Sequence, residues 1–197
     1  MEHWTDKLVE MKACPDAVAW ARSYTTPEAA WEACERPDRM FWVASRLATL
    51  RRHHQAIVLA VADCARTALK YVPAGEGRPL AAIEAAEKWA LAPSEENRAA
   101  AGSAAWAAWI AAWAARDAAR DAAWAACDAA WAAAWATETG WAACDATGAA
   151  AKAITGATAG ATAGAANRMM ADIVRSILGI EFSNGHWGLL VISGLGE

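Results

Sequence analysis

One stretch of the chain, Ala99 to Trp135, constrains the fold more than any other, because almost every residue in it is alanine or tryptophan. Three segments of eleven residues follow one another here, beginning at Trp106, Asp117 and Asp128. Eleven residues make three turns at about 3.67 residues per turn, which is the period of a nearly straight α-helix. Alanine is the strongest helix former. The sequence therefore predicts one long helix over residues 95–138, with Ser94 as its N-cap.

The tryptophans of this predicted helix fall on one side. At about 100° per residue they occupy a stripe about 80° wide, and the charged side chains of the helix are centred on the same side. The opposite side is alanine, which allows a second helix to approach to about 8 Å. Two interpretations stay open: the rings fill space against short neighbours, or they form a surface for a protein partner or a second copy of the chain. The candidate partner-binding residues are Trp113, Asp117, Arg120, Asp121, Trp124, Asp128 and Trp131.

The residues after Gly140 carry a second alanine-rich segment, which includes the tandem repeat ATAG-ATAG. Its glycines at 148, 156, 160 and 164 are spaced by multiples of four, so they would align on one face of a helix. Packed against the alanine face of the first helix, this segment would complete a helical hairpin over residues 94–166. A flexible low-complexity segment is the alternative.

The remaining segments predict shorter helices. Proline or an N-cap residue marks most of their starts, as in Thr26-Pro27. The predicted helices cover residues 15–24, 26–36, 38–47, 55–71, 79–92 and 168–178, after a short helix or loose arm over 1–12. The helix over 38–47 either continues into the one over 55–71 or bends before it. We expect an all-α, single-domain helical bundle of seven or eight helices over residues 1–180. A tail over 181–197 follows, in which a short β-hairpin could turn about Asn184-Gly185.

Composition excludes several classes of protein. The net charge is −4, without the basic excess that is typical of nucleic-acid binding. Five cysteines are an odd number and lack a CxxC pair, which favours reduced thiols in a cytoplasmic protein. The N-terminus lacks the pattern of a signal peptide. The uncharged run Ala99 to Ala115 is at the lower length limit of a membrane span and is alanine-rich, so we expect no membrane segment.

No catalytic, metal or cofactor motif is recognisable, so we expect a protein that is not an enzyme and has no cofactor. His53 and His54 are adjacent, and on a helix they point about 100° apart, which prevents joint chelation of one metal ion. The cluster Arg51, Arg52, His53 and His54 is a candidate site for an anion or another small ligand. A solvated helix end is the other interpretation of these four residues.

Several blocks of the sequence resemble one protein family. The blocks are CPDAVAWARSY, TPEAAWEACERPDRMFWVASRL, RPLAAIEAAEKWAL and ADIVRSIL. Together they resemble bacterial and phage proteins described as immunity proteins of polymorphic toxin systems, over roughly residues 12–180. These blocks are patterns of helix packing and contain no catalytic signature. The resemblance implies a cytoplasmic helical protein that binds and neutralises a toxin partner.

Two classes of function therefore stay open. The first is a non-catalytic binding protein of the immunity type, which recognises another protein. The second is a protein that sequesters a small molecule or nucleotide, through Arg51, Arg52 and a Trp-rich groove. A structural or assembly role is a more distant alternative, and the Trp-rich face could also join two copies of the chain.

Overall fold

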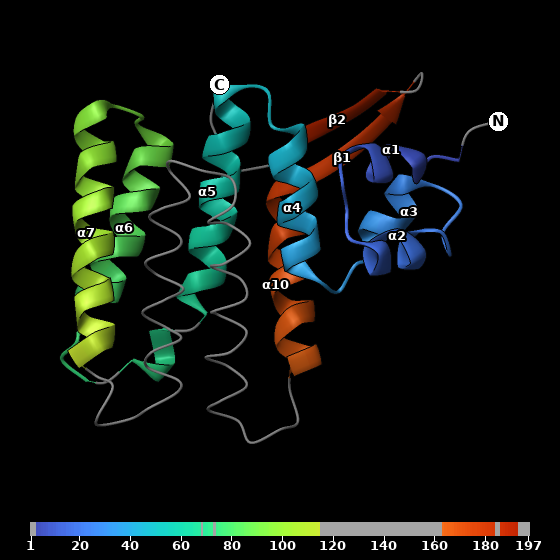
Figure 1. Ribbon diagram of the computed structural model, residues 1–197. Helices are drawn as coiled ribbons and strands as arrows, with labels where there is room; N and C mark the ends of the chain where they lie inside the picture. The colour runs from blue at the N-terminus through green and yellow to red at the C-terminus, as the bar shows by residue number, and fades with distance from the viewer. Residues whose placement is uncertain (1–2, 68, 73, 115–162, 184–185, 193–197) are drawn as a thin grey trace.

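The computed structural model describes residues 3–67, 69–72, 74–114, 163–183 and 186–192. This part of the chain is mostly helical, with a small two-stranded antiparallel sheet near its C-terminal end, which confirms the predicted fold class (Figure 1). The helices are α1 (Asp6–Glu10), α2 (Pro15–Ala21), α3 (Pro27–Ala33), α4 (Pro37–Leu47), α5 (Arg51–Arg66), α6 (Arg78–Leu91), α7 (Glu95–Ala114) and α10 (Ala163–Ile177). The strands are β1 (Leu178–Ser183) and β2 (His186–Val191), and a short 3₁₀ turn covers Leu69–Tyr71.

Two predicted helix starts are confirmed by their capping contacts. Thr26 precedes α3, and its hydroxyl oxygen accepts a hydrogen bond from the backbone N–H of Ala29 at 3.1 Å. Ser94 precedes α7 and accepts in the same way from the N–H of Asn97 at 3.1 Å. In both cases a short side chain satisfies an N–H group that the first turn of a helix leaves without an intrahelical partner.

The bounds of α5 differ from the prediction at both ends. The helix begins at Arg51, one turn before the expected Gln55, because Ala48 and Leu50 are extended and separate it from α4. It ends at Arg66, before the expected Tyr71. There the Thr67 hydroxyl donates to the carbonyl oxygen of Cys64 at 2.6 Å and replaces a further helical hydrogen bond.

The elements lie side by side in a row, with α5 near the middle (Figure 1). α6 packs against α5, and α7 packs against α6. On its other side α5 contacts α10, which also contacts α4. The hairpin and the short helices α1, α2 and α3 form the far end of the row (Figure 1). α5 is buried on most of its surface, as expected for a helix surrounded by others.

The predicted hairpin on either side of Asn184-Gly185 is confirmed by the register of its two strands. Phe182 pairs with Trp187 and Ser183 with His186, so the connection contains the two residues 184 and 185. β1 begins at Leu178, directly after α10 and before the expected start of the tail. Leu178 and Leu189 are buried in the main core, so these strands are part of the packed structure.

Much of the alanine-rich hairpin predicted over 94–166 lies outside the described residues, which include α7 only as far as Ala114 and resume at Ala163 in α10. Within the described ranges, no helix combines the length and the apolar character needed to cross a membrane.

Candidate functional site

A cavity of about 420 Å³ lies where the N-terminal helices meet α4 and the hairpin. Its wall is largely apolar and includes five indole rings, from Trp4, Trp20, Trp31, Trp42 and Trp187. These rings come from the turn before α1, from α2, α3 and α4, and from β2. The cavity is therefore a product of tertiary packing and not of one helix face.

α3, which carries Trp31, is held in place by two long-range contacts. The Arg175 guanidinium of α10 donates to the carbonyl oxygens of Trp31, at 3.4 Å, and Cys34, at 2.9 Å. Cations commonly satisfy the free carbonyls at the C-terminal end of a helix in this way. At the other end of α3, the Glu28 carboxylate accepts from the backbone N–H of Phe182 in β1 at 3.0 Å. The helix α3 is thus fixed relative to α10 and the hairpin.

The short helix α1 ends in a Schellman motif that shapes the entry to α2. The N–H of Ala13 bonds the carbonyl of Leu8 at 2.9 Å, and the N–H of Lys12 bonds that of Val9 at 2.9 Å. Lys12 adopts a φ of 64°, the left-handed conformation that this motif usually gives to glycine. Leu8 and Ala13 then pack together beside the cavity.

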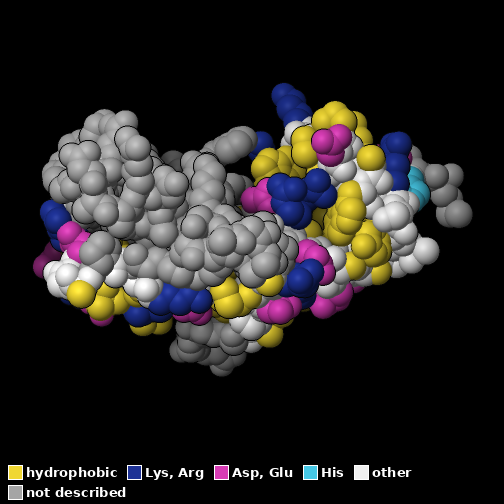
Figure 2. Space-filling model, turned by 90° about the horizontal axis from the view of Figure 1, so that it is seen from below, with side chains coloured by type: hydrophobic (Ala, Val, Ile, Leu, Met, Phe, Trp, Pro, Cys, Tyr) yellow, Lys and Arg dark blue, Asp and Glu magenta, His cyan; other side chains and the backbone are white. Residues whose placement is uncertain are grey.

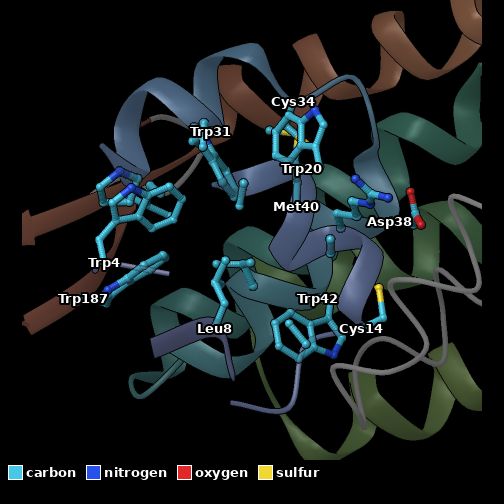
Figure 3. Close-up of a pocket in the computed structure, with 18 of the residues that line it drawn as sticks. Trp4, Leu8, Cys14, Trp20, Trp31, Cys34, Asp38, Met40, Trp42 and Trp187 are labelled. Atoms are coloured by element: carbon cyan, nitrogen blue, oxygen red, sulfur yellow. The ribbon is translucent and has the colours of Figure 1, made fainter. Parts of the chain in front are cut away.

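The two sides of the cavity differ in chemistry. Trp4 and Trp187 lie together on one side, and Asp38 and Cys14 lie on the opposite side (Figure 3). The rings of Trp4 and Trp187 are 5.8 Å apart between centroids, so they make a continuous aromatic wall. The charged residues of the lining are Lys12, Asp38 and Arg39.

Two indole N–H groups of the cavity wall have no hydrogen-bond partner among the described residues. Trp4 donates to the backbone oxygen of Tyr24 at 3.1 Å. By contrast, Nε1 of Trp31 and Nε1 of Trp187 are buried and unpaired within the described part of the molecule. Buried polar groups are nearly always paired, and leaving one unpaired destabilises a fold by about 1–3 kcal/mol. Both groups are covered, so an occupant of the cavity reaches them only if the ring turns.

The charges at the polar side are arranged around Asp38. Arg36 donates to both oxygens of the Asp38 carboxylate, at 2.9 and 2.7 Å, and this hydrogen bonding raises the pKa of Arg36. The Arg39 guanidinium lies over the ring of Trp20, 5.7 Å from its centroid.

Cys34 donates its thiol hydrogen to the carbonyl of Arg36 at 3.5 Å, and burial raises the pKa of this thiol above its usual value. A thiol with a raised pKa is a weak nucleophile at neutral pH.

The predicted anion cluster is divided by the structure. Arg51, Arg52 and His54 are exposed in the first turn of α5, whereas His53 is buried. Nδ1 of His53 accepts from the backbone N–H groups of Thr49, at 3.2 Å, and Leu50, at 3.4 Å. Burial, followed by the charges of Arg52 and His54, lowers the pKa of His53. His53 therefore caps the start of α5, and the three exposed residues alone remain as the candidate cluster.

The predicted partner-binding stripe lies almost entirely outside the residues that the structure describes. This applies to Asp117, Arg120, Asp121, Trp124, Asp128 and Trp131. The backbone of Trp113 is part of α7, but its side chain lies outside what the structure describes. The two interpretations of the stripe therefore both stand as predictions.

Sequence reasoning missed the cavity, although it placed Trp20 and Trp31 on helices of the N-terminal part. Four of the five cavity tryptophans, at positions 4, 20, 31 and 42, fall early in a chain that contains thirteen. The density of large rings on helices of only five to eleven residues was the one sequence feature that pointed to a cavity in this region. It could not show that the rings converge, or that Trp187 joins them.

Metal binding and similarity to known proteins give no further assignment. Among the described side chains, no group of three or more His, Cys, Asp and Glu residues is placed to hold a metal ion. Comparison with protein-family models, curated proteins and solved structures finds no significant match to this chain. The resemblance to immunity proteins therefore remains a prediction.

Proposed function

We propose that this chain is a non-catalytic binding protein and that the tryptophan-lined cavity is its ligand site. The observation that carries the proposal is a cavity of about 420 Å³ with five indole rings in its wall. Small-molecule sites usually have volumes of about 300–1,000 Å³ and apolar, aromatic linings with few polar groups. The occupant is a small molecule with a predominantly apolar body.

The surrounding contacts support a preformed site. α3 is tied to α10 through Arg175 and to β1 through Glu28, so the wall that carries Trp31 does not depend on an occupant. A site that is already ordered binds more tightly, because less conformational entropy is lost on association.

A substitution that fills the cavity tests the proposal. Ala17 of α2 lines the cavity and is half-buried, whereas Ala19 on the same helix is exposed. Ala17→Phe should occupy the space and abolish binding of apolar ligands, while Ala19→Phe should bind like the unchanged protein. Thermal-shift screening of the three proteins against a library of apolar small molecules provides the readout. Hits that stabilise Ala17→Phe as strongly as the unchanged chain would contradict the proposal.

Neutralisation of a protein toxin is the other proposal, and it rests on the family resemblance. Native mass spectrometry after incubation with cell lysate separates the two proposals. A gain of a few hundred daltons supports the cavity ligand, whereas a gain of tens of kilodaltons that persists in Ala17→Phe supports a protein partner.

A further inference from the structure

The charged residues in the cavity wall leave a net excess of positive charge. Lys12, Asp38 and Arg39 are the charged residues in the wall. The Asp38 carboxylate is already bound through both oxygens by Arg36, which lies outside the lining. A carboxylate paired in this bidentate way has little attraction left for a cationic ligand. The ligand-facing charge is therefore set by Lys12 and Arg39.

Arg39 is oriented by an aromatic ring and not by an acid. Its guanidinium lies over Trp20 at 5.7 Å from the ring centroid, and no carboxylate of the described residues forms an ion pair with it. Stacking uses the face of a guanidinium and leaves the N–H donors at its edge available. Those donors match the two oxygens of a carboxylate. Arg39 is half-buried, so such a contact would be only partly screened by water.

Lys12 adds a second cation at a fixed position of the backbone. Its φ of 64° places it at the corner between α1 and α2, where the Schellman motif holds the chain. Its side chain is exposed and makes no ion pair with the described acidic residues. On the face seen from below, basic and acidic side chains lie among hydrophobic ones over this end of the molecule (Figure 2). A left-handed lysine is uncommon, because residues other than glycine are strained there.

We propose that the cavity binds an amphipathic monoanion, with its apolar body among the tryptophan rings and its carboxylate held by Arg39 and Lys12. This inference rests on the proposed function, namely that the cavity is a ligand site. Aromatic cages that bind quaternary ammonium groups take a cationic ligand, so the proposed preference of this cavity for an anion is the opposite of theirs. A cation in this cavity would meet two positive charges and one carboxylate that is already paired.

Three probes with a ten-carbon skeleton test the charge preference: decanoate, 1-decanol and decyltrimethylammonium. The two ions are used below their micelle concentrations and 1-decanol below its solubility limit. Isothermal titration calorimetry on the full chain should give decanoate an affinity at least about tenfold higher than 1-decanol, with decyltrimethylammonium weakest. One charge-assisted hydrogen bond is sufficient for a difference of that size. Raising the salt concentration should weaken decanoate binding and leave 1-decanol binding unchanged.

The variant Arg39→Gln should remove most of the affinity difference between decanoate and 1-decanol and leave 1-decanol affinity unchanged. Arg46→Gln is the matched control. Arg46 is also on α4 and also lies over a tryptophan ring, 5.4 Å from the centroid of Trp42, but it is not part of the cavity wall. Lys12→Gln should reduce decanoate affinity less than Arg39→Gln, since the ammonium of Lys12 is more exposed.

The outcomes separate this inference from the proposed function. Equal binding of decanoate and 1-decanol, tighter binding of decyltrimethylammonium, or equal effects of Arg39→Gln and Arg46→Gln would overturn the inference while the ligand site stands. If none of the three probes binds the unchanged chain, or if all bind Ala17→Phe equally well, the proposed function fails together with the inference.

Discussion

The α5–α6 contact and the N-terminal end of this molecule are packed with side chains of different size. Where α5 meets α6, most of the fully buried residues are alanine, including Ala56 and Ala60 of α5 and Ala82 and Ala86 of α6. At the N-terminal end, the helices α1, α2 and α3 are only five to seven residues long, and tryptophans fill much of the space between them. Short side chains on long helices can close-pack with few voids. Large rigid rings on short helices cannot fill every gap, and a cavity remains.

The same contrast appears in the polar contacts. Bidentate hydrogen bonds join Arg66 of α5 to Glu87 of α6 at 2.6 Å each, and Gln55 donates to the carbonyl of Ala90 at 2.6 Å. The tryptophan-lined end instead contains two buried indole N–H groups that no described residue pairs with. These polar groups of α5 and α6 are therefore paired with each other, whereas the tryptophan-lined region leaves two indole N–H groups without a described partner.

The largest expected effect comes from replacing one alanine with leucine in each region, at the α5–α6 contact and in the cavity wall. Ala86→Leu should lower the free energy of unfolding by about 1–3 kcal/mol, because a fully buried alanine has no room for three more carbons. Ala17→Leu should leave the stability unchanged or raise it slightly, since the added carbons enter the cavity. Urea denaturation of both variants measures the difference. Equal losses would show that the two regions are packed alike.

An intermediate effect is expected at the left-handed residue of the cavity end. Lys12→Gly should raise the free energy of unfolding by about 1 kcal/mol, because glycine adopts a φ of 64° without strain. Lys12→Ala removes the charge but keeps the strained conformation, so it should give no gain. Thermal melts of the two variants separate the backbone effect from the charge effect, and a similar gain in both would argue against the strain.

The smallest effect concerns His53, the buried imidazole at the start of α5. Burial lowers its pKa in the folded state, so the unfolded chain binds more protons near the ordinary histidine pKa of about 6.5. Stability should therefore fall as the pH drops from 7.5 to 5.5. His53→Gln should flatten this fall, and His54→Gln, which changes the exposed neighbour, should not. An identical pH dependence in all three proteins would exclude His53 as its source.

The local signals in the sequence predicted the elements well. Thr26 and Ser94 cap helices as expected, because capping acts through contacts a few positions away. The strands on either side of Asn184-Gly185 pair as the expected hairpin. The start of α5 was missed, since it depends on the ring of His53 turning back to the N–H groups of Thr49 and Leu50.

The candidate site was beyond the reach of the sequence for a different reason. Trp4 and Trp187 are nearly at opposite ends of the described chain, and no local pattern relates them. The alanine and tryptophan repeat predicted a binding surface on residues such as Trp124, which lie outside the residues that the structure describes. The cavity depends on contacts that only the folded chain makes, such as the one between Arg175 and the end of α3.

The position of Trp187 in the cavity wall has a consequence for how the protein is made. During synthesis, Trp4 leaves the ribosome long before β2 does, so for most of that time its ring lacks the Trp187 ring that it packs against. Contacts between distant parts of a chain form late and slowly, and exposed apolar surface promotes aggregation in the meantime. Chains that stop before residue 187 would leave this aromatic surface open, whereas completion of the hairpin closes it. Closure of the site thus coincides with the arrival of the last strand.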